Sequence, residues 1–171
     1  MAINKDSNTY TISFAIVLVI LVGGLLAAIA NGLKPLQDEN LVNEKKQNIL
    51  NCLPGNKSIT RDEAGSVFAN FVKQRVILNY NGEIKENTLL DNSTELNNKD
   101  SRDAFSIDLL KEYKTIKDEK SRNYPLFICD VEGKTYYVAP VMGKGLWAAV
   151  WGFIAIDESG NSISGTVFDH K

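Results

Sequence analysis

The sequence predicts an α+β fold, in which one amino-terminal transmembrane helix is followed by a soluble domain built on an antiparallel sheet. Three observations predict this fold. An uncharged apolar run occupies residues 11–33, an amphipathic and charged segment follows it, and the carboxyl-terminal part alternates β-branched stretches with glycine-containing turns. With 171 residues, the chain has room for one ordinary domain besides such an anchor.

The apolar run predicts a helix that crosses a lipid bilayer. Residues 14–30 read FAIVLVILVGGLLAAIA, and no charged residue occurs from Ser7 to Leu33. At about 1.5 Å per residue this core spans about 26 Å, and its uncharged flanks extend it to the thickness of the hydrocarbon layer. We therefore expect residues 1–10 to form a short tail and residues 11–33 to form the transmembrane helix.

Three other interpretations of this run are open. A cleaved signal peptide would explain Ala28-Ile29-Ala30, which resembles a small-residue cleavage site, but the run exceeds the usual apolar length of about 7–15 residues. A buried core helix is disfavoured because the run has no polar face. A pilin-like stem would carry a glutamate early in the run, and this run has no acidic residue.

The orientation of the chain in the membrane depends on few charges. Lys5 stands before the run, whereas Lys34, Lys45 and Lys46 follow it. The positive-inside rule taken alone therefore favours a cytoplasmic carboxyl-terminal part, by a small margin.

The helices of the soluble part are predicted from caps and periodicity. A juxtamembrane helix is expected over residues 34–54, beginning at Pro35 and ending at Pro54-Gly55, and residues 55–171 are expected to form the soluble α+β domain. A second helix should begin at Thr60, where T-R-D-E forms a capping box with Glu63. Its apolar face is expected to comprise Val67, Phe68, Phe71 and Val72.

The remaining elements are predicted from turn signals. Strands are expected over residues 75–80, 126–131, 135–141, 148–156 and 162–168, with a turn at 81–82, a surface loop over 83–103, a short helix over 104–113, and a three-residue hairpin loop over 132–134. Glycine in a strand interior often marks a bulge or a close approach of another backbone segment. We therefore expect one of these at Ser164-Gly165-Thr166.

Composition and motifs exclude several classes of function. A net charge of −2 without a basic stripe argues against a nucleic-acid partner. Cys52 and Cys129 form no C-x-x-C pair, and they could be two buried thiols or one disulfide. The sequence has one histidine, His170, which is too few for a Cys/His zinc site. Gly143-x-Gly145 lacks the rest of a dinucleotide fingerprint. The sequence predicts no catalytic residue and no metal ligand.

Several segments together resemble one known family. They include Asn31-Gly32-Leu33-Lys34-Pro35, Tyr124-Pro125-Leu126-Phe127, Gly143-Lys144-Gly145-Leu146-Trp147, Trp151-Gly152-Phe153-Ile154-Ala155-Ile156 and Phe168-Asp169-His170-Lys171. In this order they resemble the NqrC family, one of the subunits of the sodium-translocating NADH:quinone oxidoreductase (Na⁺-NQR), in the form found in Bacteroidetes-type bacteria. The resemblance to RnfG, the corresponding subunit of the related Rnf complex, is weaker.

The resemblance implies a single-pass protein of the bacterial inner membrane with a periplasmic domain of the FMN-binding type. It implies electron transfer through FMN, held covalently by a phosphoester to a threonine, and it implies other membrane subunits and the lipid bilayer as partners. It also implies that Gly145, Leu146, Trp147 and His170 line one side of the flavin region.

The sequence departs from the family pattern after His170. In the family this region continues into a Glu-Thr-Pro-Gly-Leu-Gly segment and later into Ser-Gly-Ala-Thr, which carries the flavin, and neither segment occurs here. Thr166, in Ser164-Gly165-Thr166, is therefore not a predicted flavin ligand, and the FMN-binding domain is expected to be incomplete. The sequence leaves open a truncated redox subunit, a membrane-anchored interaction subunit without flavin, and a cleaved, secreted domain.

Overall fold

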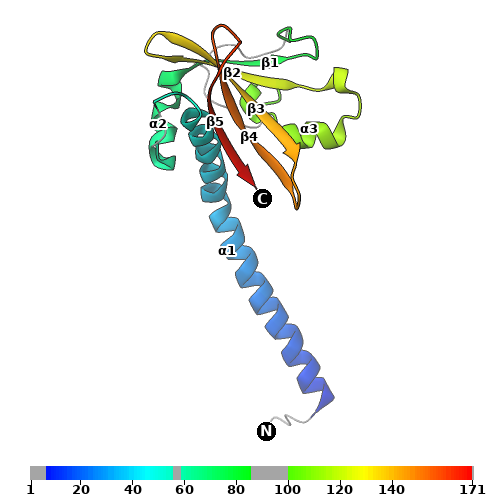
Figure 1. Ribbon diagram of the computed structural model, residues 1–171. Coiled ribbons are helices and arrows are strands. Elements are labelled where there is room, and N and C mark those ends of the chain that lie inside the picture. Colours follow the sequence, from blue (N-terminus) through cyan, green and yellow to red (C-terminus); the bar gives the residue numbers. More distant parts are fainter. Residues whose placement is uncertain (1–6, 56–58, 86–99, 171) are drawn as a thin grey trace. The chain divides into compact units, whose positions relative to one another are not determined.

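We describe a computed structural model of the chain over residues 7–55, 59–85 and 100–170 (Figure 1). The chain divides into two compact units, Met1–Leu41 and Val42–Lys171, and each is described by itself. The helices and strands, in chain order, are α1 (Asn8–Asn51), α2 (Arg61–Phe71), β1 (Val72–Leu78), η1 (Ala104–Ser106), α3 (Leu109–Thr115), η2 (Glu119–Ser121), β2 (Tyr124–Val131), β3 (Lys134–Lys144), β4 (Ala149–Asp157) and β5 (Ile163–His170).

Helix α1 is one continuous helix, whereas the sequence predicts a tail and two helices with the second starting at Pro35. Pro35 lies inside α1. A proline in a helix removes one backbone hydrogen bond, here to the carbonyl of Asn31, and the turns on either side keep theirs. The predicted boundary between residues 33 and 34 therefore coincides with no break in the helix, and the division of the chain at that point stays a prediction.

The apolar part of α1 has the length and composition of a membrane span. An 18-residue window of this helix has a mean hydropathy of 2.9, and none of that window is buried within the structure. By length and composition alone, α1 can therefore cross a bilayer.

The carboxyl-terminal unit is built on an antiparallel sheet, as the sequence predicts, and its five strands lie in the order β1-β2-β3-β4-β5. The β2–β3 hairpin differs from the prediction by one residue, because Val131 pairs with Lys134 and the loop holds only two residues. Glu132 and Gly133 have φ of 54° and 78°, and positive φ at both central residues is the mark of a type I′ turn, whose twist matches that of paired strands.

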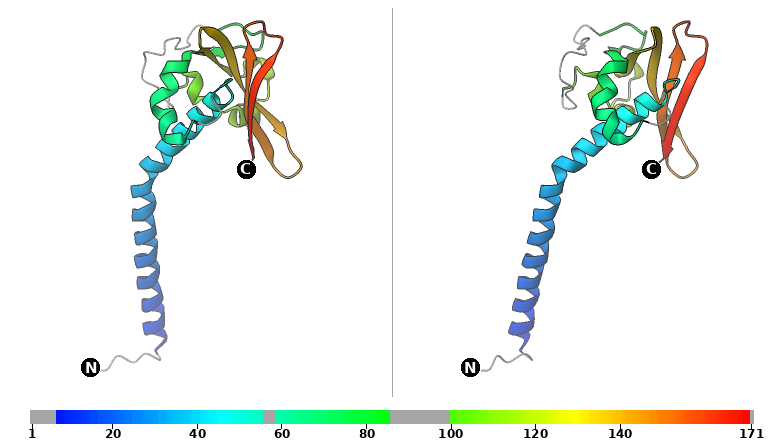
Figure 2. Two further views of the ribbon diagram at one scale, coloured as in Figure 1. Left: turned by 60° about the vertical axis from the view of Figure 1, so that its left-hand side comes forward. Right: turned by 90° about the vertical axis from the view of Figure 1, so that its left-hand side faces the viewer.

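One face of the sheet is covered by α2 and by residues 42–51 of α1 (Figure 2). Four rings join these layers: Phe68 of α2, Phe105 of η1, Phe127 of β2 and Phe153 of β4. Their successive centroids are 5.8, 6.4 and 6.5 Å apart in edge-to-face arrangements, which aromatic rings prefer to direct face-to-face stacking. The core of the unit therefore runs from α2 through the short η1 segment to the middle of the sheet.

The predicted start of α2 is confirmed and its predicted end is wrong. The Thr60 side chain accepts a hydrogen bond from the Glu63 backbone N–H, and the Glu63 carboxylate accepts one from the Thr60 backbone N–H, which completes the capping box. Val72, assigned from the sequence to the apolar face of this helix, has extended dihedral angles and begins β1. It is nevertheless fully buried, so its hydrophobic side chain reaches the core from a strand.

The close approach predicted at Gly165 is confirmed, together with a register shift beside it. The β4–β5 pairing shifts between Ala155, which pairs with Gly165, and Ile156, which pairs with Ile163. A Cβ atom built on Gly165 would collide with the backbone carbonyl oxygen of Cys52, which directly follows α1. The absence of a side chain at Gly165 therefore lets the end of α1 pack against β5.

Candidate functional site

The four residues predicted to lie near a flavin come together at one end of the sheet. Gly145, Leu146 and Trp147 form the turn between β3 and β4, and the Gly145 backbone N–H donates a hydrogen bond to the Ala148 carbonyl oxygen over 3.0 Å. In register, Gly143 pairs with Val150, and Val150 pairs in turn with His170 on β5. The side chain of His170 lies outside the described part of the structure, so its role stays a prediction.

The side chains at this turn point into solvent. Leu146 is 91% exposed and Trp147 is 95% exposed. Gly145 has a structural role, because a Cβ at this position would lie 2.6 Å from the Ala148 carbonyl oxygen and 2.9 Å from a methyl carbon of Val150. The turn thus exposes two apolar side chains, and it requires glycine at position 145, where a side chain would collide with the backbone.

A cavity of about 350 Å³ lies elsewhere, between α3, the segment before β2, and β3. It is mainly apolar, and its lining includes Tyr113, Arg122 and Met142, but none of the four predicted residues. The guanidinium of Arg122 lies 5.0 Å from the centroid of the Tyr113 ring and also donates to the Ile116 carbonyl oxygen, so this cation has partners within the fold. The cavity and the turn between β3 and β4 are therefore separate features.

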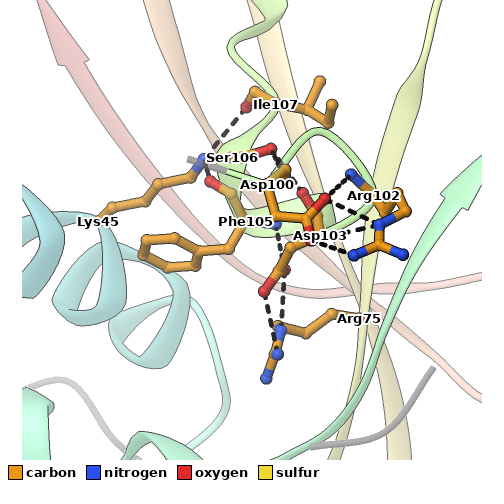
Figure 3. A network of polar contacts seen from close by, with 8 residues as sticks. All are labelled: Lys45, Arg75, Asp100, Arg102, Asp103, Phe105, Ser106 and Ile107. Carbon is orange, nitrogen blue, oxygen red and sulfur yellow. Dashed lines mark hydrogen bonds and ion pairs between the residues drawn. The ribbon is translucent and has the colours of Figure 1, made fainter. Parts of the chain in front are cut away.

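A buried polar network ties α1 and β1 to residues 100–107 (Figure 3). Arg75 of β1 forms a two-pronged ion pair with Asp103, with nitrogen–oxygen distances of 2.9 and 3.0 Å, and the two side chains are 2% and 0% exposed. The Asp103 carboxylate also accepts a hydrogen bond from the Phe105 backbone N–H. These charge-assisted hydrogen bonds offset the loss of water around the buried carboxylate.

Lys45 of α1 makes the second half of this network. Its ammonium donates to the carbonyl oxygens of Phe105 and Ile107 at 2.6 and 3.1 Å, and it lies 4.8 Å from the centroid of the Phe105 ring. Burial lowers the pKa of Lys45 to about 8, against the opposing influence of the Asp108 and Asp103 carboxylates. The network therefore joins the end of α1 to η1, and its contacts stabilise the fold.

Sequence reasoning missed this network, because residues 83–103 are predicted to be a surface loop. Asp103 caps η1 and is fully buried, which contradicts that expectation for the end of the loop; residues 86–99 lie outside the described residues. Arg75, which directly precedes the apolar residues Val76-Ile77-Leu78 of the same strand, was the available signal for a buried partner.

Both cysteines are free and buried. Burial raises the pKa of the Cys52 thiol to about 12 and raises that of Cys129 further, so both are plain core thiols at neutral pH. Within the described ranges, no group of three or more His, Cys, Asp or Glu side chains is placed to hold a metal ion.

Comparison with known proteins identifies relatives along nearly the whole chain, although no family model matches it. The NqrC subunit of the Na⁺-translocating NADH-quinone reductase from Neisseria meningitidis (serogroup A) is 26% identical over 166 residues, which cover 96% of this chain and 64% of the relative. The same protein from Vibrio anguillarum is 28% identical over 173 residues, which cover 98% of this chain and 65% of the relative. Over nearly its whole length, this chain is therefore similar to NqrC proteins.

A solved structure supports the same relationship. The crystal structure of NqrC from Parabacteroides distasonis matches with a TM-score of 0.63 and 29% identity, over 81% of this chain and 58% of that one. The chain thus spans a little under two thirds of the length of these NqrC relatives.

The residues present fit FMN only in part. Leu146 and Trp147 offer an exposed apolar surface that suits one side of an isoalloxazine ring. The Ser-Gly-Ala-Thr segment that the resemblance implies for flavin attachment does not occur in the sequence given, and Thr166 sits in β5 opposite Ile154. A flavin beside this turn therefore stays a prediction.

Proposed function

We propose that this chain is the anchoring and sheet-forming part of an NqrC protein that works within a sodium-translocating NADH:quinone reductase. The observation that carries the proposal is the match to NqrC proteins over 96–98% of this chain, together with the match of its sheet to a solved NqrC structure. The partners are the other membrane subunits of that complex and the lipid bilayer. The soluble unit faces the periplasm, as the resemblance implies, although the lysine count alone favours the opposite side.

The resemblance implies that a covalently bound FMN would carry the electrons. The flavin supplies the redox chemistry, and the protein binds and orients it. On this proposal Gly145, Leu146, Trp147 and His170 border one side of the flavin. The tight turn at Gly145 sets the position of the two apolar side chains, and β5 brings His170 to the same end of the sheet.

The test is the intact mass of the protein expressed from its native locus, measured under denaturing conditions. A mass above 18.9 kDa that includes an FMN adduct supports the redox subunit. A mass of 18.9 kDa without an adduct, combined with the absence of flavin absorbance, contradicts it. The orientation is tested in the same cells with a single cysteine introduced at an exposed position, for example in place of Glu158. Its reaction with a thiol-reactive probe shows whether that position is reached from the periplasmic or the cytoplasmic side.

A second candidate is a membrane-anchored interaction protein without flavin. It is favoured by the exposed Leu146 and Trp147, which suit a contact surface as well as a flavin wall. In that case the chain would copurify with the other proteins of the reductase while carrying no flavin. The two candidates are therefore separated by measuring flavin content and complex membership in the same purified sample.

A further inference from the structure

The pairing of β2 with β3 stops in the middle of the sheet. Their register ends at the Phe127–Val138 pair, although β2 begins earlier, at Tyr124, and β3 continues to Lys144. Each strand stays paired on its other side, β2 with β1 and β3 with β4. The sheet therefore has a gap between two strands that both remain extended.

Two prolines explain the end of this pairing. The β2–β3 turn is a two-residue loop, so the pair next to it is hydrogen-bonded, and so is every second pair after it, including Phe127–Val138. The next pair of this kind would join Pro125 to Pro140. Proline has no backbone N–H, so neither residue could donate to the other. The gap therefore arises from the sequences of β2 and β3 themselves.

Helix α3 takes the place of β3 beside the start of β2. The Asn123 backbone N–H donates to one oxygen of the Glu112 carboxylate at 2.9 Å, and the Asn123 side-chain amide donates to the other at 3.2 Å. In an unbroken ladder, Asn123 would have paired with Met142. Helix α3 also contacts β3. The gap is therefore closed at one end by the Phe127–Val138 pair and spanned at the other by α3.

The cavity of about 350 Å³ lies in this gap. Its lining includes Pro125 and Leu126 of β2, Pro140 and Met142 of β3, and Leu109 of α3. Ligand pockets usually measure about 300–1,000 Å³, so this cavity suits a molecule of one or two rings. An extended peptide does not suit it, because α3 already lies across the open end of the gap.

Backbone groups of β3 give the cavity a polar edge. The Gly145–Ala148 hydrogen bond fixes the pattern of the β3–β4 ladder, in which the N–H and C=O groups of every second residue point to β4. The Met142 N–H and the carbonyl oxygens of Pro140 and Met142 therefore point to the β2 side, where no strand of the described residues pairs with them. A ligand that presents a donor beside an acceptor can satisfy these groups.

The charged residues of the lining favour a neutral ligand. Both carboxylate oxygens of Glu112 accept hydrogen bonds from Asn123. Arg122 donates to the carbonyl oxygens of Ile116 and Lys117. A charged ligand would find both of these side chains engaged within the fold, and it would lose its hydration in a mainly apolar cavity.

We propose that the gap between β2 and β3 binds a small neutral molecule that has an apolar ring body and a cyclic-amide edge. The carbonyl of the amide accepts from the Met142 N–H, and its N–H donates to a carbonyl oxygen of Pro140 or Met142. The rings contact the side chains of Leu109 and Leu126. The proposal goes beyond the proposed function, because none of the four residues placed beside the flavin lines this cavity.

The test is a titration of the full chain in nanodiscs with 2-quinolone, a neutral two-ring cyclic amide. Met1 and Met142 are the two methionines of the sequence, so ¹³C labelling of methionine methyl groups gives at most two resonances, and Met142→Leu assigns the one from the cavity. This resonance should shift saturably with 2-quinolone. N-methyl-2-quinolone keeps the rings and the carbonyl but lacks the N–H, and it should bind about three- to tenfold more weakly.

Two alanine substitutions separate binding in the cavity from uptake into lipid. Ala139 lines the cavity, so Ala139→Leu should fill part of it and weaken the binding of 2-quinolone by about tenfold or more. Ala69 is exposed on α2 and does not line the cavity, so Ala69→Leu should leave the titration unchanged. If Ala139→Leu fails to fold, the comparison of the two ligands still decides, because it needs no substitution in the cavity.

The proposal is overturned if 2-quinolone causes no saturable shift of the Met142 resonance, or if the two ligands bind equally well. The titration is repeated on the protein expressed from its native locus. Loss of binding there would show that other polypeptide fills the cavity, and it would also overturn the proposal. No flavin enters these measurements, so their outcome is independent of the mass measurement that tests the proposed function.

Discussion

Replacing Gly165 with alanine should separate the end of α1 from β5. The new Cβ would collide with the Cys52 carbonyl oxygen, a backbone atom that cannot rotate away as a side chain would. Overpacking a close-packed site costs about 1–3 kcal/mol, and a backbone neighbour places this change at about 3 kcal/mol. For a unit of about 130 residues, this loss corresponds to a fall in Tm of roughly 10 °C.

The matched control is Gly143→Ala on β3, since a Cβ there meets nothing within 4 Å. This change should alter the free energy of unfolding by no more than about 0.5 kcal/mol. Urea titrations of the full chain in nanodiscs, followed by tryptophan fluorescence, measure both variants. Equal unfolding midpoints for the two variants would refute the close approach of the Cys52 carbonyl to β5.

Three further predictions concern caps and buried charges. Asp103→Asn should lower the free energy of unfolding by about 3–5 kcal/mol, because the buried Arg75 loses its carboxylate. The exposed control Glu158→Gln should leave urea denaturation unchanged. Thr60→Ala should cost about 1 kcal/mol by removing the cap of α2, and wild-type stability in thermal melts would argue against that cap. Between about pH 8 and about pH 10.5, the unfolded chain binds a proton at Lys45 that the folded chain has lost. Over this range the free energy of unfolding should therefore rise with pH, relative to that of the Lys45→Met protein, by up to about 3 kcal/mol. A pH-independent difference between these two proteins in urea titrations would contradict the lowered pKa of Lys45.

Much of the fold was predictable because its signals are local. The capping box at Thr60 depends on residues three positions apart. The strands of the carboxyl-terminal part are marked by β-branched runs and by glycine turns, and short connections make β2 to β5 antiparallel neighbours. The special position of Gly165 was predictable as a bulge or a close approach, but its partner Cys52 was not.

The candidate site was predictable only in its residue types. Gly145, Leu146 and Trp147 were singled out by resemblance to a family motif, and His170 by its place in the same motif series. That all four lie at one end of the sheet depends on the β3–β4 and β4–β5 registers, which pair Lys144 with Ala149 and Val150 with His170. Register of this kind is set by packing of whole strands, which short motifs do not encode.

By itself, the sequence determined the apolar helix, the antiparallel sheet and most turns of this protein, because hydrophobic periodicity and special dihedral angles are properties of neighbouring residues. Only the tertiary structure decided that Arg75 pairs with Asp103, that Lys45 reaches two carbonyl groups of the η1 region, and that Trp147 is left uncovered. These depend on which surfaces meet after folding, where the cost of burying a charge or exposing an indole is set by partners far away in the chain.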